Sequence, residues 1–383
     1  MTNGDTAEVA YKFGTEVLGP FLSAFTEWLR GEVRLAKPSK LFFFSRDGFL
    51  MRQAYEIADA ASPLGVPHEY VHFSRRALRT PLLHSCKTMG ETFSLFSWQR
   101  YVSYSEVFSF WGLTDTEVRE CVSRTGDKVI PFEALPGCGD LEEAFARHAD
   151  VIRSRSAEQF RLVGDYIRKI GMSGRVAIVD IGWHGTMQSQ LETLLRTLGV
   201  EADILGLYVG IGPRRALQGE AHGFIYTGKD DNRRFRILCF FGGVEKLFQG
   251  FEGSTMGYED SPDGARPALD AFEYSDDADI LTTIGRYQSA ALDFVRSGHP
   301  GSAGPLLRFG CNPPAWGREL FRSFFNFDNG VRLYLLPQKG LLRHSPRELV
   351  LRLSQSSWKT GFLRDALRLP FLPYVALYRL LKK

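Results

Sequence analysis

Two aspartates in this chain follow short apolar stretches and stand beside glycines, a setting that could bind and transform an anionic ligand. Asp180 comes after four apolar residues, and a loop with Gly182 and Gly185 follows it. Glycine lets backbone N–H groups approach an anion closely, and the N-terminus of a following helix adds partial positive charge. Asp47 stands in the same setting, directly before Gly48. These residues predict an anion site; the alternative is an ordinary strand-to-helix turn in which Asp180 or Thr186 is only a cap.

Arginines form the second set of residues that could do chemistry. Arg75, Arg76 and Arg79 lie close together after a third apolar stretch, and Arg46 directly precedes Asp47. The planar guanidinium group donates two parallel hydrogen bonds to phosphate. The cluster therefore favours phosphate or pyrophosphate binding. The alternatives are a solvated basic turn for the cluster and a simple salt bridge with Asp47 for Arg46.

The apolar patterns predict which elements position these residues. Strands are expected at residues 41–44, 69–73, 176–179, 204–210 and 223–226, and helices at 8–35 (interrupted at Gly19-Pro20), at 49–61 and from Thr186 onward. Asp180 is expected to close its strand. The repeated order of strand, polar loop and helix predicts an α/β fold with a Rossmann-like parallel sheet. Its ligand site should lie at the carboxyl ends of neighbouring strands, in a shared crevice.

The rest of the chain is expected to form additions to this sheet. The predicted division is the first part of the α/β domain with an N-terminal helix (1–84), a helical insertion (85–170), the second part of the α/β domain (171–260), a helical and irregular region (261–340) and a basic C-terminal segment (341–383). The insertion, with helices expected at 141–148 and 151–170 among others, is expected to cover the crevice and to help choose the acceptor. Residues 228–236 and 260–270 are expected to be loops. Glu245 lies in an apolar helical pattern, where a lone Glu is usually a solvated side chain. The glycine-rich loop with Ser254 is a candidate for another wall of the site.

The C-terminal segment is rich in cations that alternate with apolar residues. From Leu341 on, nine Lys or Arg stand against two acidic residues, interleaved with Leu, Phe, Trp and Tyr. This pattern is typical of an amphipathic segment that lies on a membrane surface. The alternative is a C-terminal helix packed on the domain with its basic face in water.

Composition excludes several classes of protein. The net charge of +3 gives no electrostatic argument for nucleic-acid binding. The five cysteines are scattered without a CxxC pair, which argues against a disulfide framework and a cysteine zinc site. The N-terminal residues lack the features of a secretory signal, and no apolar run approaches the ~20 residues that span a bilayer. We expect a cytoplasmic protein that either stays free or lies peripherally on the inner face of the cell membrane.

Three motifs that occur together in this order resemble the phosphoribosyltransferase module of bacterial surface-polysaccharide assembly. They are FFFSRDGFLM (42–51), FSRRALRTP (73–81) and VAIVDIGWHGTMQSQL (176–191), and GGVEKLFQGFEGSTMGY (242–258) extends the match in a looser form. The resemblance implies transfer of 5-phosphoribose from phosphoribosyl pyrophosphate (PRPP) to a glycan acceptor, lipid-linked or free, of an O-antigen or capsule. A haloacid-dehalogenase-type phosphatase then removes the 5-phosphate; because this chain has no DxDx[TV] motif, that enzyme would be a separate partner.

The resemblance also implies roles for individual residues. Asp47 is expected to be the catalytic base that takes the proton of the acceptor hydroxyl, and Asp180 to hold ribose hydroxyls or a metal, although the two roles could be exchanged. The expected donor-binding residues are Ser45, Arg46, Gly48, Arg75, Arg76, Arg79, Gly182, Trp183, His184, Gly185, Thr186, Gln188, Glu245 and Ser254. Mg²⁺ is the candidate cofactor. However, nucleotide-type phosphoribosyltransferases place two adjacent acidic residues before their phosphate loop, and only Asp180 stands here.

Two other functions fit parts of the sequence. In a haloacid-dehalogenase-like phosphatase Asp47 would be the nucleophile, but such enzymes need a second Asp two residues later, where Phe49 stands. The other reading is a non-catalytic scaffold in a glycan-assembly complex, in which the glycine loops are structural. Asp, Arg and Gly at three strand ends favour the enzyme.

Overall fold

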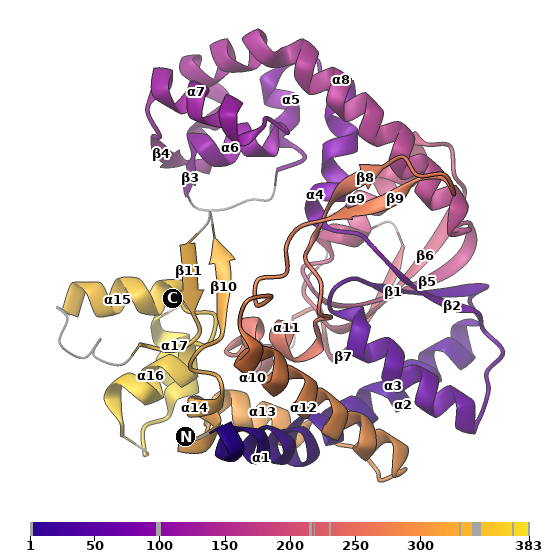
Figure 1. The fold of residues 1–383 in the computed structure, drawn as a ribbon, viewed down its shortest axis with the longest axis vertical. Coiled ribbons are helices and arrows are strands. Elements are labelled where there is room, and N and C mark those ends of the chain that lie inside the picture. The colour runs from indigo at the N-terminus through magenta and orange to yellow at the C-terminus, as the bar shows by residue number, and fades with distance from the viewer. Residues whose placement is uncertain are drawn as a thin grey trace.

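A five-stranded parallel sheet forms the centre of the computed structural model, which describes residues 3–96, 101–213, 217, 219–229, 231–328, 331–338, 346–369 and 371–381 (Figure 1). The strands are β1 (Lys40–Phe44), β2 (His68–Val71), β5 (Gly174–Trp183), β6 (Ala202–Ile211) and β7 (Glu220–Thr227), in the order β2-β1-β5-β6-β7. Every neighbouring pair is parallel. The predicted α/β class and the predicted pairing of the first and central strands are confirmed.

Both faces of the sheet are buried, which explains why its strands are continuous apolar runs. Successive side chains of a strand point to opposite faces. Leu41 and Phe43 of β1 therefore pack in one core, and Phe42 and Phe44 in another. The first core includes α1 (Asn3–Phe13), α2 (Gly19–Ala36), α3 (Gly48–Ala61) and α12 (Ala278–Arg296); the second includes α4 (Arg75–Arg79) and α9 (Thr186–Thr197).

The N-terminal helical region is interrupted earlier than its sequence suggests. The break is a π-helical turn at Gly14–Leu18, whereas Pro20 lies in the first turn of α2, where its missing N–H costs nothing. A Cβ on Gly14 would lie 2.4 Å from the Tyr287 carbonyl oxygen. Glycine at this position therefore allows α12 to pack closely against the N-terminal helices.

The insertion between β2 and β5 forms a lobe with its own apolar core. Its elements are α5 (Met89–Phe93), β3 (Tyr101–Ser103), α6 (Tyr104–Phe110), α7 (Asp115–Thr125), β4 (Val129–Pro131) and α8 (Gly139–Lys169), with 3-10 turns at Thr80–Ser85 and Phe132–Gly137. Helix α8 is continuous, where the sequence pattern predicts separate helices at 141–148 and 151–170. Its first half packs in the lobe, and Leu162 to Ile167 pack against the sheet, so one helix joins the two cores.

The chain after the sheet adds helices and short hairpins. They are α10 (Asp231–Leu238), α11 (Phe241–Phe248), β8 (Thr255–Glu259), β9 (Arg266–Leu269), α13 (Gly304–Cys311), α14 (Ala315–Leu320), β10 (Phe325–Asp328), β11 (Val331–Tyr334), α15 (Pro346–Gln355), α16 (Lys359–Leu367) and α17 (Tyr374–Leu381). The loop predicted at 228–236 is wrong from Asp231 on, where α10 begins. Of the loop predicted at 260–270, residues 260–265 do form the loop of the antiparallel β8–β9 hairpin, whereas 266–269 form β9.

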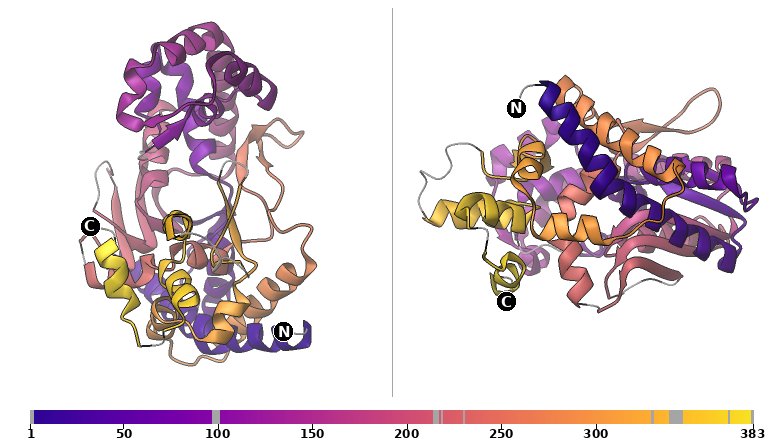
Figure 2. Two further views of the ribbon diagram at one scale, coloured as in Figure 1. Left: turned by 90° about the vertical axis from the view of Figure 1, so that its left-hand side faces the viewer. Right: turned by 90° about the horizontal axis from the view of Figure 1, so that it is seen from below.

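The C-terminal helices pack on the body, at the end of the molecule opposite the insertion lobe (Figure 2). Trp358 is fully buried; its indole N–H donates to the Gly310 carbonyl at 2.9 Å, and its ring stacks on Phe309 at 5.6 Å. Phe371 and Leu380 are 76% and 69% exposed. Residues 341–345, 370 and 382–383 of the predicted basic segment lie outside the described residues. Among the described helices, none has the length and apolar character needed to cross a membrane.

Candidate functional site

A pocket of about 270 Å³ opens at the carboxyl ends of β1 and β5. Between these strands the order of the sheet changes direction, and such points are where open α/β sheets bind ligands. The predicted site residues that line the pocket are Ser45, Arg46, Asp47, Arg75, Asp180, Gly182, Trp183, His184, Gly185, Thr186, Gln188, Glu245 and Ser254. Gly48, Arg76 and Arg79 do not line it. The predicted crevice at neighbouring strand ends is therefore present.

The turn between β5 and α9 forms one wall of this pocket. Strand β5 continues through Asp180 to Trp183, so the prediction that Asp180 closes the strand was wrong. Gly182 has a φ of +94°, and a Cβ there would lie 2.7 Å from the Tyr208 ring. Gly185, with a φ of +69°, is the N-cap residue of α9. The alternative in which Asp180 only caps the helix is therefore also wrong.

Trp183 holds this turn in a conformation that is unfavourable for a side chain. Its φ is +64°, a left-handed value that costs a non-glycine residue about 1–3 kcal/mol. The indole ring is buried, and its N–H donates to Oε1 of Glu245 at 3.2 Å. Packing and this hydrogen bond thus fix the turn and connect it to α11.

Three carboxyl groups with raised pKa values meet in the pocket. Burial raises the pKa of Asp47 well above its ordinary value, and the charges of Asp180 and Glu245 add to this shift against Arg46 and Lys246. Burial also raises the pKa of Asp180 to about 6, although the N–H groups of Ile181 and Gly182 donate to its carboxylate. The pKa of Glu245 is raised by burial as well. The site can therefore hold or release protons near neutral pH.

A buried glutamate outside the predicted set holds two cations beside these carboxylates. Glu273 pairs with Arg46, and it accepts a hydrogen bond from Nζ of Lys246 at 2.5 Å. The side chains of Lys246 and Glu273 are only 4% and 8% exposed. Burial alone would raise the pKa of Glu273, but Lys246 and Arg46 outweigh burial and bring the pKa below its ordinary value. The ion-pair partner of Arg46 is therefore Glu273, and the expected simple salt bridge with Asp47 is not formed.

The three clustered arginines separate into different environments. Arg75 is exposed and lines the pocket, where its charge lowers the pKa of Asp180 and of Glu245. Arg76 is exposed as well but lies outside the lining. The guanidinium of Arg79 lies 5.8 Å and 5.1 Å from the ring centroids of Phe96 and Phe110, so it joins α4 to the insertion lobe. Burial, with the nearby arginines, lowers the pKa of Arg79 to about 10.

Two other predicted ligand residues have structural contacts instead. A Cβ on Gly48 would lie 2.8 Å from the carbonyl carbon of Phe43, so glycine here lets α3 begin against β1. The amide of Gln188 is fully buried; it donates to Glu192 at 2.9 Å and to the Glu220 carbonyl at 3.2 Å. Its oxygen accepts the hydroxyl of Tyr208 at 2.8 Å. Gln188 therefore ties α9 to β6 and β7.

The opposite wall includes residues that the sequence did not suggest. Lys246, Gln249, Thr255, Tyr208 and Asn326 line the pocket, together with Phe73, Ser74, Ile181 and Met187. They come from α11 and its C-terminal end, β6, β8 and β10, and also from β5, α9 and the segment between β2 and α4. Tyr208 and Asn326 lie outside the quoted motifs; the others lie within them, at positions that the sequence analysis did not single out.

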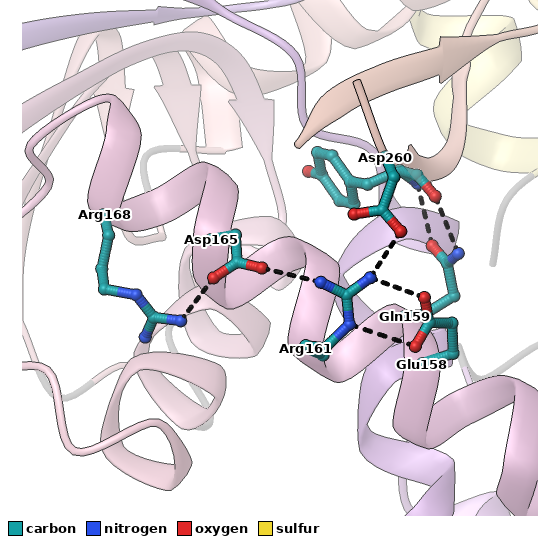
Figure 3. Close-up of polar contacts among 7 residues, drawn as sticks. Glu158, Gln159, Arg161, Asp165, Arg168 and Asp260 are labelled. Carbon is teal, nitrogen blue, oxygen red and sulfur yellow. Dashed lines mark hydrogen bonds and ion pairs between the residues drawn. The ribbon is translucent and has the colours of Figure 1, made fainter. Parts of the chain in front are cut away.

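Helix α8 holds the β8 part of this wall in place (Figure 3). Gln159 accepts the Tyr258 N–H at 2.8 Å and donates to the Tyr258 carbonyl at 2.9 Å. Arg161 bridges Glu158 of its own helix and Asp260 at the end of β8, at 2.7 Å each. On the other side, Ser74 donates to the Thr255 carbonyl at 2.6 Å. The insertion's long helix thus positions residues at the pocket.

Within the described ranges, no group of three or more His, Cys, Asp or Glu side chains is arranged to hold a metal ion. A comparison of the chain with protein-family models and with curated proteins finds no match.

Proposed function

We propose that this protein transfers the 5-phosphoribosyl group of PRPP to a hydroxyl of a glycan acceptor and releases pyrophosphate. The observation that carries the proposal is the meeting of Asp47, Asp180 and Glu245 with Arg75 and the N-terminus of α9 in one pocket. Carboxylates can activate a hydroxyl and stabilise a cationic sugar, while the guanidinium and the helix N-terminus bind phosphate. The accompanying fold proposal is a Rossmann-like sheet, supported by its strand order and by helices on both faces.

In the proposed step the acceptor oxygen attacks C1 of the ribose while the C1–oxygen bond to pyrophosphate breaks. The electron pair leaves with pyrophosphate, and the acceptor proton passes to the Asp47 carboxylate. A carboxyl group with a raised pKa suits this task, because a base works best when its pKa is near the working pH. Asp180 holds the ribose hydroxyls. Because PRPP is an α-anomer, a single displacement gives a β-ribofuranoside.

The cations of the site have different parts in this proposal. Arg75, which lines the pocket from the exposed side, binds the pyrophosphate together with the N–H groups at Thr186. Arg46 and Lys246 form ion pairs with Glu273. Their positive charges lower the pKa of Asp47 and of Glu245 against the effect of burial. Arg76 and Arg79, which were expected to bind the donor, do not line the pocket. Fewer arginines are therefore available to the donor than the sequence implies.

Mg²⁺ has no step in this mechanism. Asp180 and Glu245 offer the hard oxygen ligands that Mg²⁺ prefers, and this ion commonly binds through one or two carboxylates and substrate phosphates. Transfer measured with EDTA and after addition of Mg²⁺ tests whether the donor binds as its magnesium complex.

The phosphatase alternative gains no support from the pocket. The position two residues after Asp47, where a second aspartate would be needed, holds Phe49. Its ring packs against Tyr70 with a centroid distance of 6.1 Å and against Phe251 at 6.1 Å. Aromatic packing at this position leaves no acidic group to protonate a leaving alcohol.

We further propose that the protein acts at the cytoplasmic surface of the inner membrane, with a separate phosphatase that removes the 5-phosphate. Support comes from apolar side chains that the C-terminal region leaves in water, namely Leu367, Leu369, Phe371 and Leu380. Arg368 and Arg379 belong to the same stretch of chain. Cations beside exposed apolar groups favour an anionic lipid surface, where a lipid-linked acceptor would be found.

Release of pyrophosphate from PRPP in the presence of glycan acceptors tests the transfer. Asp47→Asn should lower acceptor-dependent release by at least about a hundredfold, the size typical of a lost general base. Asp180→Asn should also lower it, because the ribose hydroxyls lose a carboxylate that holds them. The control is Asp203→Asn, at an exposed aspartate at the amino end of β6. Full activity in both site variants would contradict the assignment.

A further inference from the structure

Two polar side chains at the pocket are buried without a protein partner. Nε2 of Gln249 and Oγ1 of Thr255 have no hydrogen bond, and both residues are only 1% exposed. Among the described residues that line the pocket, these two have a buried side-chain atom without a hydrogen bond. Because an unpaired buried polar group costs about 1–3 kcal/mol, such groups at a binding pocket indicate contacts made by a ligand.

The backbone of both residues is well fixed, so the missing partners do not reflect a loosely held segment. Gln249 ends α11; its N–H donates to the Glu245 carbonyl at 3.2 Å, and its carbonyl accepts the amide of Gln288 at 3.0 Å. The Thr255 carbonyl accepts the Ser74 hydroxyl at 2.6 Å. The next residues of β8 are held by Gln159 of α8 (Figure 3). The atoms left without a protein partner are Nε2 of Gln249 and Oγ1 of Thr255.

The chemistry of the two groups suits a neutral oxygen better than a phosphate. An amide N–H₂ donates and a threonine hydroxyl donates or accepts, and neither carries charge. The same pocket contains the carboxyl groups of Asp180 and Glu245, which accept hydrogen bonds. A sugar hydroxyl uses both kinds of partner, because it donates to a carboxylate and accepts from an amide or hydroxyl. A pyrophosphate accepts only, and it would be repelled by the carboxylates.

We propose that Gln249 and Thr255 bind the ribose hydroxyls of the donor, opposite the carboxylates that accept the hydroxyl protons. This assignment rests on the proposed function, since it takes the donor to be PRPP. It makes these two residues specificity determinants for the sugar, while Arg75 and the N-terminus of α9 bind the phosphate groups.

The test compares variants that keep the size of each side chain and remove its polar atoms. They are Gln249→Met and Thr255→Val, with Thr255→Ser as the variant that retains the hydroxyl. Thr26→Val is the matched control, because Oγ1 of Thr26 is also buried without a partner but lies on α2, away from this pocket. Calorimetric titrations with PRPP and with inorganic pyrophosphate, and melting temperatures without ligand, are measured for each protein.

We expect Gln249→Met and Thr255→Val each to weaken PRPP binding by about five- to tenfold, the effect of one lost hydrogen bond. Pyrophosphate binding should stay unchanged, Thr255→Ser should bind PRPP as wild type does, and Thr26→Val should alter neither affinity. Without ligand, the melting temperatures of Gln249→Met and Thr255→Val should rise, because an unpaired buried group has been removed.

Each contrary result has a distinct meaning. Wild-type affinity for PRPP in both site variants would overturn the assignment and leave the proposed function standing. An equal loss of pyrophosphate affinity would make the two residues phosphate ligands and overturn the ribose assignment. Lower melting temperatures would show that the side chains have partners in the free protein, which removes the premise. Failure of the wild-type protein to bind PRPP would overturn the proposed function, and the assignment with it.

Discussion

Asp180→Asn is expected to stabilise the protein at neutral pH, even though it removes a carboxylate of the proposed mechanism. Burial raises the pKa of Asp180 in the folded protein to about 6, from an ordinary value of 3.8. The folded state therefore binds the proton more tightly than the unfolded state. Below the unfolded pKa this group costs the fold nothing, and its cost grows as the pH rises through the window from about 4 to about 6.

The magnitude follows from the size of the shift. About two pKa units at about 1.4 kcal/mol each give about 3 kcal/mol of lost stability above the folded pKa. About half of this loss is already present at pH 5, so about 1–2 kcal/mol remains to be lost between pH 5 and pH 8. Asparagine does not ionise, and its oxygen can still accept the N–H groups of Ile181 and Gly182 that donate to Asp180.

Urea unfolding of the wild type and of Asp180→Asn at pH 5 and pH 8 measures this difference. The stability advantage of the variant should grow by about 1–2 kcal/mol from pH 5 to pH 8. Asp203→Asn, at the opposite end of the sheet, should follow the wild-type pH profile. An advantage that is constant or shrinks as the pH rises would refute the reasoning, because the folded pKa would then not be raised. A stabilised but inactive variant would fit a carboxylate that is kept for function.

The other predictions concern the buried ion pairs, the arginines and the C-terminal region. Glu273→Gln should destabilise the protein by about 3–5 kcal/mol in urea unfolding, because it leaves two buried cations without their partner; unchanged stability would show that the pairs are not needed. Arg75→Ala should weaken PRPP binding by about tenfold or more, and Arg76→Ala, outside the pocket, by less than about twofold; equal effects would contradict the division of the arginine cluster. Replacing both exposed residues Phe371 and Leu380 by Ser should lower co-sedimentation with anionic vesicles, and unchanged binding would refute membrane contact through this region.

Local patterns in the sequence were sufficient to predict the sheet and the position of its pocket. The runs that form β1 and β5 are apolar at successive positions because both faces of the sheet are covered. Parallel strands that pair bring their carboxyl ends to one edge, which places Asp47 and Asp180 in one pocket. Glycines mark the sharp turn between β5 and α9, because positive φ values are required there.

The extent of β5 shows where a local pattern misleads. Asp180 interrupts the apolar run, and a polar residue usually indicates the end of a buried strand. Here the strand continues to Trp183 because the carboxyl end of the sheet opens into the pocket, where a carboxylate finds N–H donors and cations. Asp180, a polar residue inside β5, therefore indicates the position of the pocket and not the end of the strand.

The charge network could not be predicted, because its members come together only through the fold. Glu273 and Arg46 lie 227 positions apart in the chain, and nothing in the irregular segment around Glu273 marks it. Lys246 lies in an apolar helix pattern. Its charge can be buried because its Nζ donates to Glu273, which the sequence around Lys246 does not reveal. Gln159 and Tyr258, which fix one wall of the pocket, are 99 positions apart.

The division of the arginine cluster has the same origin. Arg75 and Arg79 both belong to the short helix α4, and their spacing alone gives them similar roles. The insertion lobe supplies the rings of Phe96 and Phe110, which take up the guanidinium of Arg79. The contacts of Arg79 thus depend on how the insertion lobe packs against α4, and the sequence around Arg79 does not indicate that packing.

The most direct test of the proposed function is mass spectrometry of synthetic glycan acceptors after incubation with the purified protein and PRPP. The account predicts an acceptor that gains the mass of one phosphopentose, with release of one pyrophosphate, and a product that keeps its phosphate until a phosphatase is added. No mass gain across the acceptor panel, together with no calorimetric binding of PRPP by the wild-type protein, would contradict phosphoribosyl transfer.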